Sequence, residues 1–237
     1  MSEAGQSVRD FFPAHLVDGY EAFVTGRFGG EQQRYRELAE GGQSPRVMLI
    51  GCCDSRVAPE AIFDAGPGEI FVVRNVANLV PPYAPDGHYH GTSSALEFGV
   101  MALRVEHIVV MGHAQCGGVS AFAQMETDPS HPPVSPGDFI GPWIKLIAPA
   151  AARIGKPDLP VSAEYVERLA LESIKQSLAN LRSFPCIGEL EQRGKVKLHG
   201  AYFGVMDGRL LVYDAAGDRF VRVAGDLHAA ALQTPRF

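Results

Sequence analysis

The stretch MLIGCCDSR at residues 48–56 decides the fold that this sequence predicts. It begins inside an apolar run, Val47 to Ile50, which is typical of a buried parallel strand. Polar side chains begin where the run ends. In open α/β sheets, ligands bind beyond the carboxyl ends of the strands. We therefore expect Cys52, Asp54 and Arg56 to lie in a functional site.

A second stretch, HIVVMGHAQCGG at residues 107–118, repeats this arrangement of an apolar strand followed by metal-binding side chains. Zinc prefers thiolate and imidazole ligands, and catalytic zinc sites supply three protein ligands and keep one position open. Cys52, His113 and Cys116 form such a set at two strand ends. The sequence thus predicts one zinc ion per chain, although each residue alone is more often part of a core.

The remaining pattern alternates strands with helices. Further strands are predicted at 70–74, 196–205 and 209–213, and helices at 59–63, 93–103, 117–125, 143–154 and 162–181. The dipeptide Asp207-Gly208 indicates a hairpin between the last two strands. We predict an α/β fold with a mainly parallel central sheet of four strands, an antiparallel edge strand and helices on both faces.

An N-terminal helical arm precedes this sheet. Apolar residues recur at helical spacing from residue 11 onward, and Gly26, Gly29 and Gly30 are expected to interrupt the helix. Two amphipathic helices with no sheet of their own to cover can pack on another subunit. We expect residues 1–237 to form a single domain, with residues 1–40 as an arm on a partner subunit.

Composition excludes several classes of protein. The chain has 237 residues and a net charge of −6 without a basic tract, so we expect no nucleic-acid partner. No apolar run approaches the roughly 18 to 20 residues that span a bilayer, and the polar N-terminus lacks a signal core, so we expect a cytoplasmic protein. The four cysteines do not suggest a disulfide framework. Cys53 is expected to pack on the face opposite Cys52.

Asp54 and Arg56 sharpen the prediction of an open metal site. A carboxylate two residues after a ligand thiolate can take the fourth position on zinc. An arginine can instead hold that carboxylate in a bidentate ion pair and leave the metal open to water. The alternative is a surface ion pair worth about 0 to 1 kcal/mol. Gly117 and Gly118 offer free backbone N–H groups to a small anion, or simply turn the chain into a helix.

These residues, taken together, resemble the β-class carbonic anhydrases. The resemblance rests on C-x-D-x-R at 52–56, H-x-x-C-G-G at 113–118 and FVVRNVAN at 71–78. It implies reversible hydration of carbon dioxide to bicarbonate and a proton by a zinc-bound hydroxide, with Asp54 and Arg56 as catalytic residues. Asp54 would bind zinc only in a closed state. The family also implies a homodimer or larger homo-oligomer, with the N-terminal helices lying across the partner.

Within that family the chain looks more like the plant-type branch. Gln43, Phe71 and Val76 match its substrate-pocket residues, to which we add Gly117, and Phe98 stands where that branch usually has Tyr. In another branch, bicarbonate switches the enzyme off through a pocket that needs a Trp three residues before the first ligand cysteine. This chain has Leu49 there. The resemblance therefore predicts no inhibition of that kind.

Two other functions remain open from the sequence. The same fold can hydrolyse carbonyl sulfide or carbon disulfide, and access to the pocket would decide between these substrates. A non-catalytic, zinc-stabilised interaction protein is the alternative from another class. Structural zinc is normally closed by four protein ligands, whereas three are found here.

Overall fold

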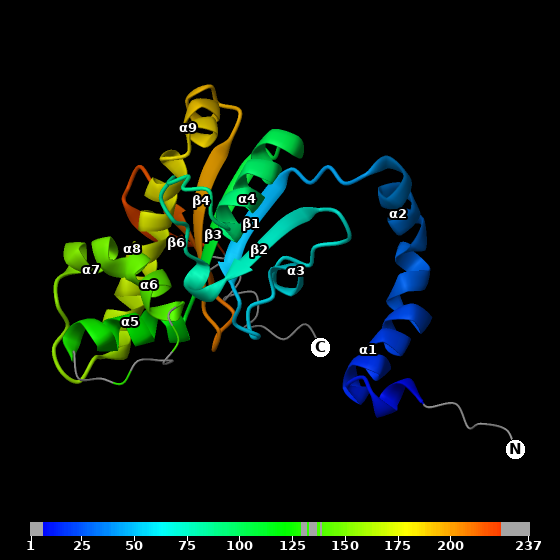
Figure 1. Cartoon of the computed structure of the whole chain (residues 1–237), viewed down its shortest axis with the longest axis horizontal. Helices are drawn as coiled ribbons and strands as arrows, with labels where there is room; N and C mark the ends of the chain where they lie inside the picture. Colours follow the sequence, from blue (N-terminus) through cyan, green and yellow to red (C-terminus); the bar gives the residue numbers. More distant parts are fainter. Residues whose placement is uncertain (1–6, 129–131, 133–136, 138, 224–237) are drawn as a thin grey trace, which may run out of the picture. The chain divides into compact units, whose positions relative to one another are not determined.

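The computed structural model describes residues 7–128, 132, 137 and 139–223 (Figure 1). The chain divides into two compact units, Met1–Gln43 and Ser44–Phe237. The first contains a 3₁₀ turn, Val8–Asp10, and two helices, α1 (Ala14–Thr25) and α2 (Arg27–Gly41). None of the three has a buried residue.

The break between α1 and α2 occurs at Gly26 alone. The predicted interruption at Gly29 and Gly30 is wrong, because both residues lie within α2. Each glycine costs a helix only about 1 kcal/mol relative to alanine. The rings of Phe23, Phe28 and Tyr35 pack against one another across the two helices and offset that cost.

The second unit is built on a six-stranded sheet of order β2-β1-β3-β4-β5-β6. Its strands are β1 (Val47–Cys52), β2 (Ile70–Asn75), β3 (His107–His113), β4 (Lys197–Phe203), β5 (Leu210–Asp214) and β6 (Arg219–Arg222). The first four are mutually parallel and the last two pair antiparallel, which confirms the predicted mainly parallel sheet. The structure adds β6, which was not predicted.

Helices connect the strands. They are α3 (Pro59–Ile62), α4 (Gly91–Glu97), α5 (Gly117–Thr127), α6 (Ile140–Ile144), α7 (Ala148–Ile154), α8 (Ala163–Arg182) and α9 (Pro185–Gln192). A π-helical turn, Phe98–Ala102, continues α4, and 3₁₀ turns occupy Val76–Asn78 and Lys145–Ile147. Figure 1 shows α5 to α8 gathered on one side of the sheet. None of the helices in the described ranges is long and apolar enough to cross a bilayer.

The sheet carries apolar residues on both faces. The larger core includes Met48, Ile50 and Val110 together with Leu169 and Ile174 of α8. On the opposite face a small cluster joins Leu49, Met111 and Ala201, and Ile62 of α3 packs against it. Helices therefore cover both faces, as predicted.

Two glycines allow α8 to approach the sheet closely. A Cβ atom on Gly112 would lie 2.9 Å from Ile174 Cδ1, and one on Gly200 would lie 2.8 Å from Ile174 Cγ2. Because interiors are packed at crystal density, an added methyl group at either position requires the Ile174 side chain or α8 itself to shift. This packing fixes the strand ends, where the predicted ligands lie.

We expect the substitution Gly200→Ala to lower the free energy of unfolding by about 1–3 kcal/mol through overpacking against Ile174. Urea denaturation measures this change. Gly91→Ala is the matched control, because its Cβ would meet no atom within 4 Å. Equal stability of the two variants would contradict the packing described here.

Candidate metal centre

The three predicted ligands meet at one edge of the sheet. Cys52 is the last residue of β1, His113 is the last residue of β3, and Cys116 directly precedes α5. Because β1 and β3 are parallel neighbours, their carboxyl ends lie side by side. One ligand atom from each of the three residues lies within 4.8 Å of the others, and all three side chains are buried.

The sulfur atoms of this cluster are placed as zinc ligands would be. Cys52 Sγ and Cys116 Sγ are 4.0 Å apart. Two thiolates on one tetrahedral zinc, with bonds of about 2.3 Å, stand about 3.8 Å apart. The donor set of two sulfurs and one imidazole therefore fits zinc.

His113 gives a second indication of a metal. Its ring nitrogen Nδ1 is 2.9 Å from the carbonyl oxygen of Ala114, an arrangement in which Nδ1–H donates. Its other nitrogen, Nε2, is buried and has no hydrogen-bond partner among the residues that the structure describes. Buried polar atoms are nearly always satisfied, and an imidazole whose one nitrogen is fixed by a carbonyl presents the other to a metal.

The two thiols are strongly coupled. The hydrogen bond from the Cys116 thiol lowers the pKa of Cys52 to about 4. The same hydrogen bond, together with burial, raises the pKa of Cys116 far above its usual value. Backbone N–H groups of Asp54 and Ala77 also favour the Cys52 thiolate. Without a cation the pair retains one proton, and a cation between the sulfurs would release it.

Asp54 and Arg56 lie beside this cluster as a bidentate pair. Arg56 Nε donates to Asp54 Oδ1 at 2.9 Å, and Arg56 Nη2 donates to Asp54 Oδ2 at 2.7 Å. The same Nη2 donates to the carbonyl of Gln115 at 3.2 Å, in the loop between two ligands. Asp54 Oδ2 is 3.9 Å from His113 Nε2. The carboxylate therefore borders the metal position while its oxygens are held by Arg56.

This pair sets the charge of Asp54. The hydrogen bonds from Arg56 hold the pKa of the Asp54 carboxyl well below its usual range. Asp54 is consequently ionised at neutral and mildly acidic pH. Any stability that the depressed pKa contributes is present above the unfolded value of about 3.9 and is lost as the pH falls toward the folded value.

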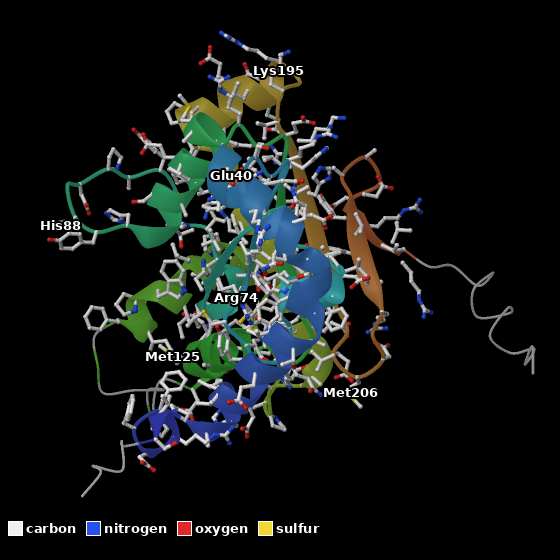
Figure 2. The ribbon with its side chains drawn as sticks, turned by 90° about the vertical axis from the view of Figure 1, so that its right-hand side faces the viewer. Glu40, Arg74, His88, Met125, Lys195 and Met206 are labelled. Carbon is white, nitrogen blue, oxygen red and sulfur yellow. The ribbon has the colours of Figure 1, made fainter. Side chains whose placement is uncertain are left out.

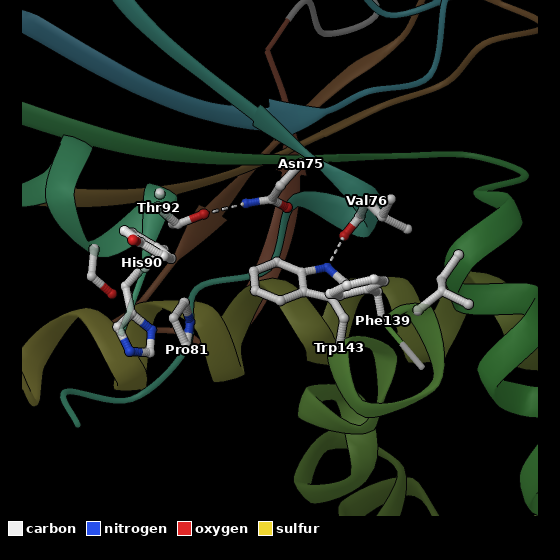
Figure 3. Close-up of a pocket in the computed structure, with 11 residues that line it drawn as sticks. Asn75, Val76, Pro81, His90, Thr92, Phe139 and Trp143 are labelled. Atoms are coloured by element: carbon white, nitrogen blue, oxygen red, sulfur yellow. Dashed lines mark hydrogen bonds between the residues drawn. The ribbon is translucent and has the colours of Figure 1, made fainter. Parts of the chain in front are cut away.

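A turn after β2 closes the other side of the cluster. Ala77 and Asn78 have positive φ angles of 63° and 49°, which non-glycine residues rarely adopt. Trp143 Nε1 donates to the carbonyl of Val76 at 2.8 Å and braces the turn from α6 (Figure 3). A Cβ on Gly118 would lie 2.9 Å from Val76 Cγ1, so glycine is needed where α5 meets the turn.

A cavity of 510 Å³ borders this turn. Val76, Pro81, His90, Phe139 and Trp143 are among the residues that line it (Figure 3). Val76, predicted as a substrate-pocket residue, therefore stands between this cavity and Gly118 at the start of α5.

The other predicted pocket residues are distributed differently. Gly117 begins α5, with open space beside it. Phe71 and Phe98 form an aromatic pair with centroids 5.9 Å apart, and Phe98 is half exposed. Gln43 is the last residue of the N-terminal unit and is exposed. Only Val76 and Gly117 adjoin the metal ligands within the second unit.

Two residues at the metal centre were not predicted from the sequence, and a third was predicted in the wrong environment. Cys53 is exposed, so its predicted packing role is wrong. Its backbone N–H donates to Asn75 O at 3.0 Å, one residue beyond the end of β1. Ala77 and Trp143 were not predicted as part of the site. For Ala77 the available signal was its position directly after a strand that ends at the same edge.

Comparisons with known proteins agree with this geometry. A profile of the Carbonic anhydrase family matches residues 47–210. The chain is 33% identical over 209 residues to a carbonic anhydrase of Pseudomonas aeruginosa, covering 88% of this chain and 91% of the relative. It is 35% identical over 194 residues to beta carbonic anhydrase 3 of Arabidopsis thaliana, covering 81% and 73%.

Solved structures show the same likeness. The beta-carbonic anhydrase CcaA superposes with a TM-score of 0.75 at 27% identity, over 90% of this chain and 92% of that one. A tetrameric beta-carbonic anhydrase of Sordaria macrospora gives a TM-score of 0.68 at 25% identity, over 90% and 96%.

We expect Cys52→Ala, His113→Ala and Cys116→Ala each to purify without bound zinc, because the two remaining protein ligands bind the ion too weakly to retain it through purification. Elemental analysis of the purified proteins measures this. Cys53→Ala is the matched control and should keep about one zinc per chain, since its thiol is exposed beside the site. Full zinc content in the three ligand variants would refute the assignment.

Proposed function

This chain belongs to the β-class carbonic anhydrases, and on that premise we propose how its own residues carry out the family's reaction. The protein is a zinc enzyme that hydrates carbon dioxide reversibly to bicarbonate and a proton. The observation that carries this function is the buried cluster of Cys52, His113 and Cys116 at two adjacent strand ends. A non-catalytic zinc protein is thereby set aside.

Zinc held by these three residues supplies a Lewis acid that makes water acidic enough to lose a proton near neutral pH. The rest of the chemistry belongs to the protein. We assign Asp54 as the group that accepts a hydrogen bond from the reacting water and orients its lone pair toward carbon dioxide. Its ionised state and its place 3.9 Å from His113 Nε2 support this role.

Arg56 keeps Asp54 available for that role. Its guanidinium donates a hydrogen bond to each carboxylate oxygen, and this pairing keeps Asp54 from binding zinc as a fourth ligand. At the start of α5 the backbone N–H groups of Gly118 and Val119 favour the Cys116 thiolate, while open space adjoins Gly117, where a small anion such as the product can approach the helix N-terminus. Val76 contributes an apolar wall.

We expect Asp54→Asn to lower kcat/KM for hydration by about 10²- to 10⁴-fold, the usual contribution of a positioned acid–base group. Zinc content should remain near one per chain. Stopped-flow hydration with a pH indicator measures the rate. Asp218→Asn removes an exposed carboxylate paired with Lys175 and serves as the control. An Asp54→Asn enzyme of normal activity would exclude the role.

We further propose that the chain follows the plant-type branch in lacking a bicarbonate switch. Leu49 is buried in the small apolar cluster with Met111 and Ala201, so its position offers no polar group to an anion. The bidentate pairing of Asp54 with Arg56 corresponds to the open state. Phe98, in place of Tyr, keeps the pocket wall apolar and removes one hydroxyl.

The rate of hydration near pH 7 should therefore fall with added bicarbonate only as simple product competition predicts, with a Hill coefficient near one. Initial rates at increasing bicarbonate, matched in ionic strength by sodium chloride, measure this. A steep, cooperative loss of activity would contradict the assignment to this branch.

We propose a homodimer or larger homo-oligomer, with residues 1–40 as an arm on the partner and Gln43 facing the partner's metal site. The separation of the N-terminal unit at Gln43 supports an arm. Its exposed apolar side chains, which include Phe12 and Leu16, favour a partner surface. The Sordaria macrospora relative is described as tetrameric.

Leu16→Asp should shift the protein toward smaller species in sedimentation velocity and reduce activity, because it places a charge on the apolar face of the arm. Gln32→Asp adds a charge to an exposed polar position of α2 and should leave the mass unchanged. An unchanged mass for Leu16→Asp and for a chain lacking residues 1–40 would rule out the arm.

We also propose the cytoplasm as the compartment, since all four cysteines are free and two must stay reduced to bind zinc.

A further inference from the structure

Arg74 lies in β2, directly opposite Gly51 of β1, and its side chain reaches the loop that follows β1 (labelled in Figure 2). Arg74 Nε donates to the carbonyl of Cys52 at 2.8 Å, and Arg74 Nη2 donates to the carbonyl of Asp54 at 2.6 Å. The side chain is partly buried. One guanidinium therefore holds the backbone at both ends of a three-residue segment.

We propose that Arg74 is a positioning residue, which fixes the first zinc ligand and the catalytic carboxylate relative to each other. The inference rests on the proposed role of Asp54. Arg74 touches neither the thiolate nor the carboxylate, and it acts through the peptide groups that carry them.

The hydrogen bonds of the sheet alone do not fix Cys52 and Asp54 relative to each other. Cys52 is the last residue of β1, and Asp54 lies beyond the strand. Among the described residues, the carbonyl of Asp54 otherwise accepts one local backbone hydrogen bond, from Val57 N–H at 3.1 Å. Arg74 adds a charge-assisted bond from a neighbouring strand, which is about twice as strong as a neutral one.

Other groups at the end of β2 act in the same direction. Cys53 N–H donates to Asn75 O at 3.0 Å, and the Ala77 N–H favours the Cys52 thiolate. The carboxyl end of β2 thus contacts the Cys52–Asp54 segment through its backbone and through Arg74. The guanidinium of Arg56, by contrast, holds the Asp54 side chain and the carbonyl of Gln115, in the loop between His113 and Cys116.

The geometry also explains why an arginine is required. A planar guanidinium offers donors in a fixed fork, whereas the ammonium of lysine is a point charge on a flexible stem. Lysine at this position would keep the charge but would not span two carbonyls with the same rigidity. The two contacts also direct Nε and Nη2 toward the backbone, not toward a free anion.

The test compares Arg74→Ala and Arg74→Lys with the wild-type full chain, all loaded with zinc. Transfer of zinc to a coloured chelator should be about 10- to 100-fold faster in Arg74→Ala, and kcat/KM should fall by a similar factor, as for other groups that orient metal ligands. Arg74→Lys should recover only part of both losses. Added guanidinium ion should slow zinc transfer in Arg74→Ala.

Arg46→Gln is the matched control. Its guanidinium pairs with Glu106 at the amino end of the sheet, where Arg46 Nε lies 3.0 Å from Glu106 Oε1. Zinc transfer from this variant should match the wild type. Fluorescence of Trp143, the single tryptophan, checks that each variant is folded.

The proposal would be overturned if Arg74→Ala transferred zinc at the wild-type rate. It would also be overturned if Arg74→Lys had the wild-type rate of zinc transfer and the wild-type kcat/KM. If Arg74→Ala does not fold, the proposal is tested with Arg74→Lys, both by zinc transfer and after its zinc is replaced by cobalt. Thiolate-to-cobalt absorption bands identical to those of the wild type would then count against positioning. An active Asp54→Asn enzyme together with fast zinc transfer in Arg74→Ala would refute the role of Asp54 and leave the fixing of Cys52 intact.

Discussion

Two buried cysteine sulfurs held 4.0 Å apart form the constraint on which the rest of the site depends. Both cannot carry a negative charge in a buried environment unless a cation lies between them. His113 Nε2 is buried beside them without a hydrogen-bond partner in the described part of the chain, and it provides a third ligand atom for the same cation. Burial removes these three ligand atoms from water, and coordination to zinc compensates for that loss.

The sheet provides the rigidity that such an arrangement needs. Parallel pairing of β1 with β3 brings the ends of the two strands to one edge, and close packing of α8 on Gly112 and Gly200 limits their movement. Outside the strands, order comes from the end of β2, through Arg74 and the turn at Ala77. Rigid backbone therefore carries the ligands, while the roles proposed for Asp54 and Arg56 depend on their paired side chains.

Much of this was predictable from the sequence, and the exceptions have physical causes. The ligand set was predictable because the apolar runs before Cys52 and His113 mark two buried strands and place both residues at the carboxyl ends of those strands. The strand β6 was not, because four residues with arginines at both ends resemble a surface loop until Phe220 pairs with Tyr213. The continuous α2 was missed because tertiary ring contacts override the weak helix propensity of glycine. Arg74 acts through backbone carbonyls, which no side-chain pattern reveals.

The central claim is an open zinc site whose neighbouring carboxylate is kept off the metal by Arg56. A crystal structure of the zinc-loaded protein near pH 7 tests it most directly. The claim predicts zinc bound by Cys52, His113 and Cys116 with a non-protein oxygen in the fourth position, and Asp54 paired with Arg56. An Asp54 oxygen bonded to zinc under those conditions would contradict it.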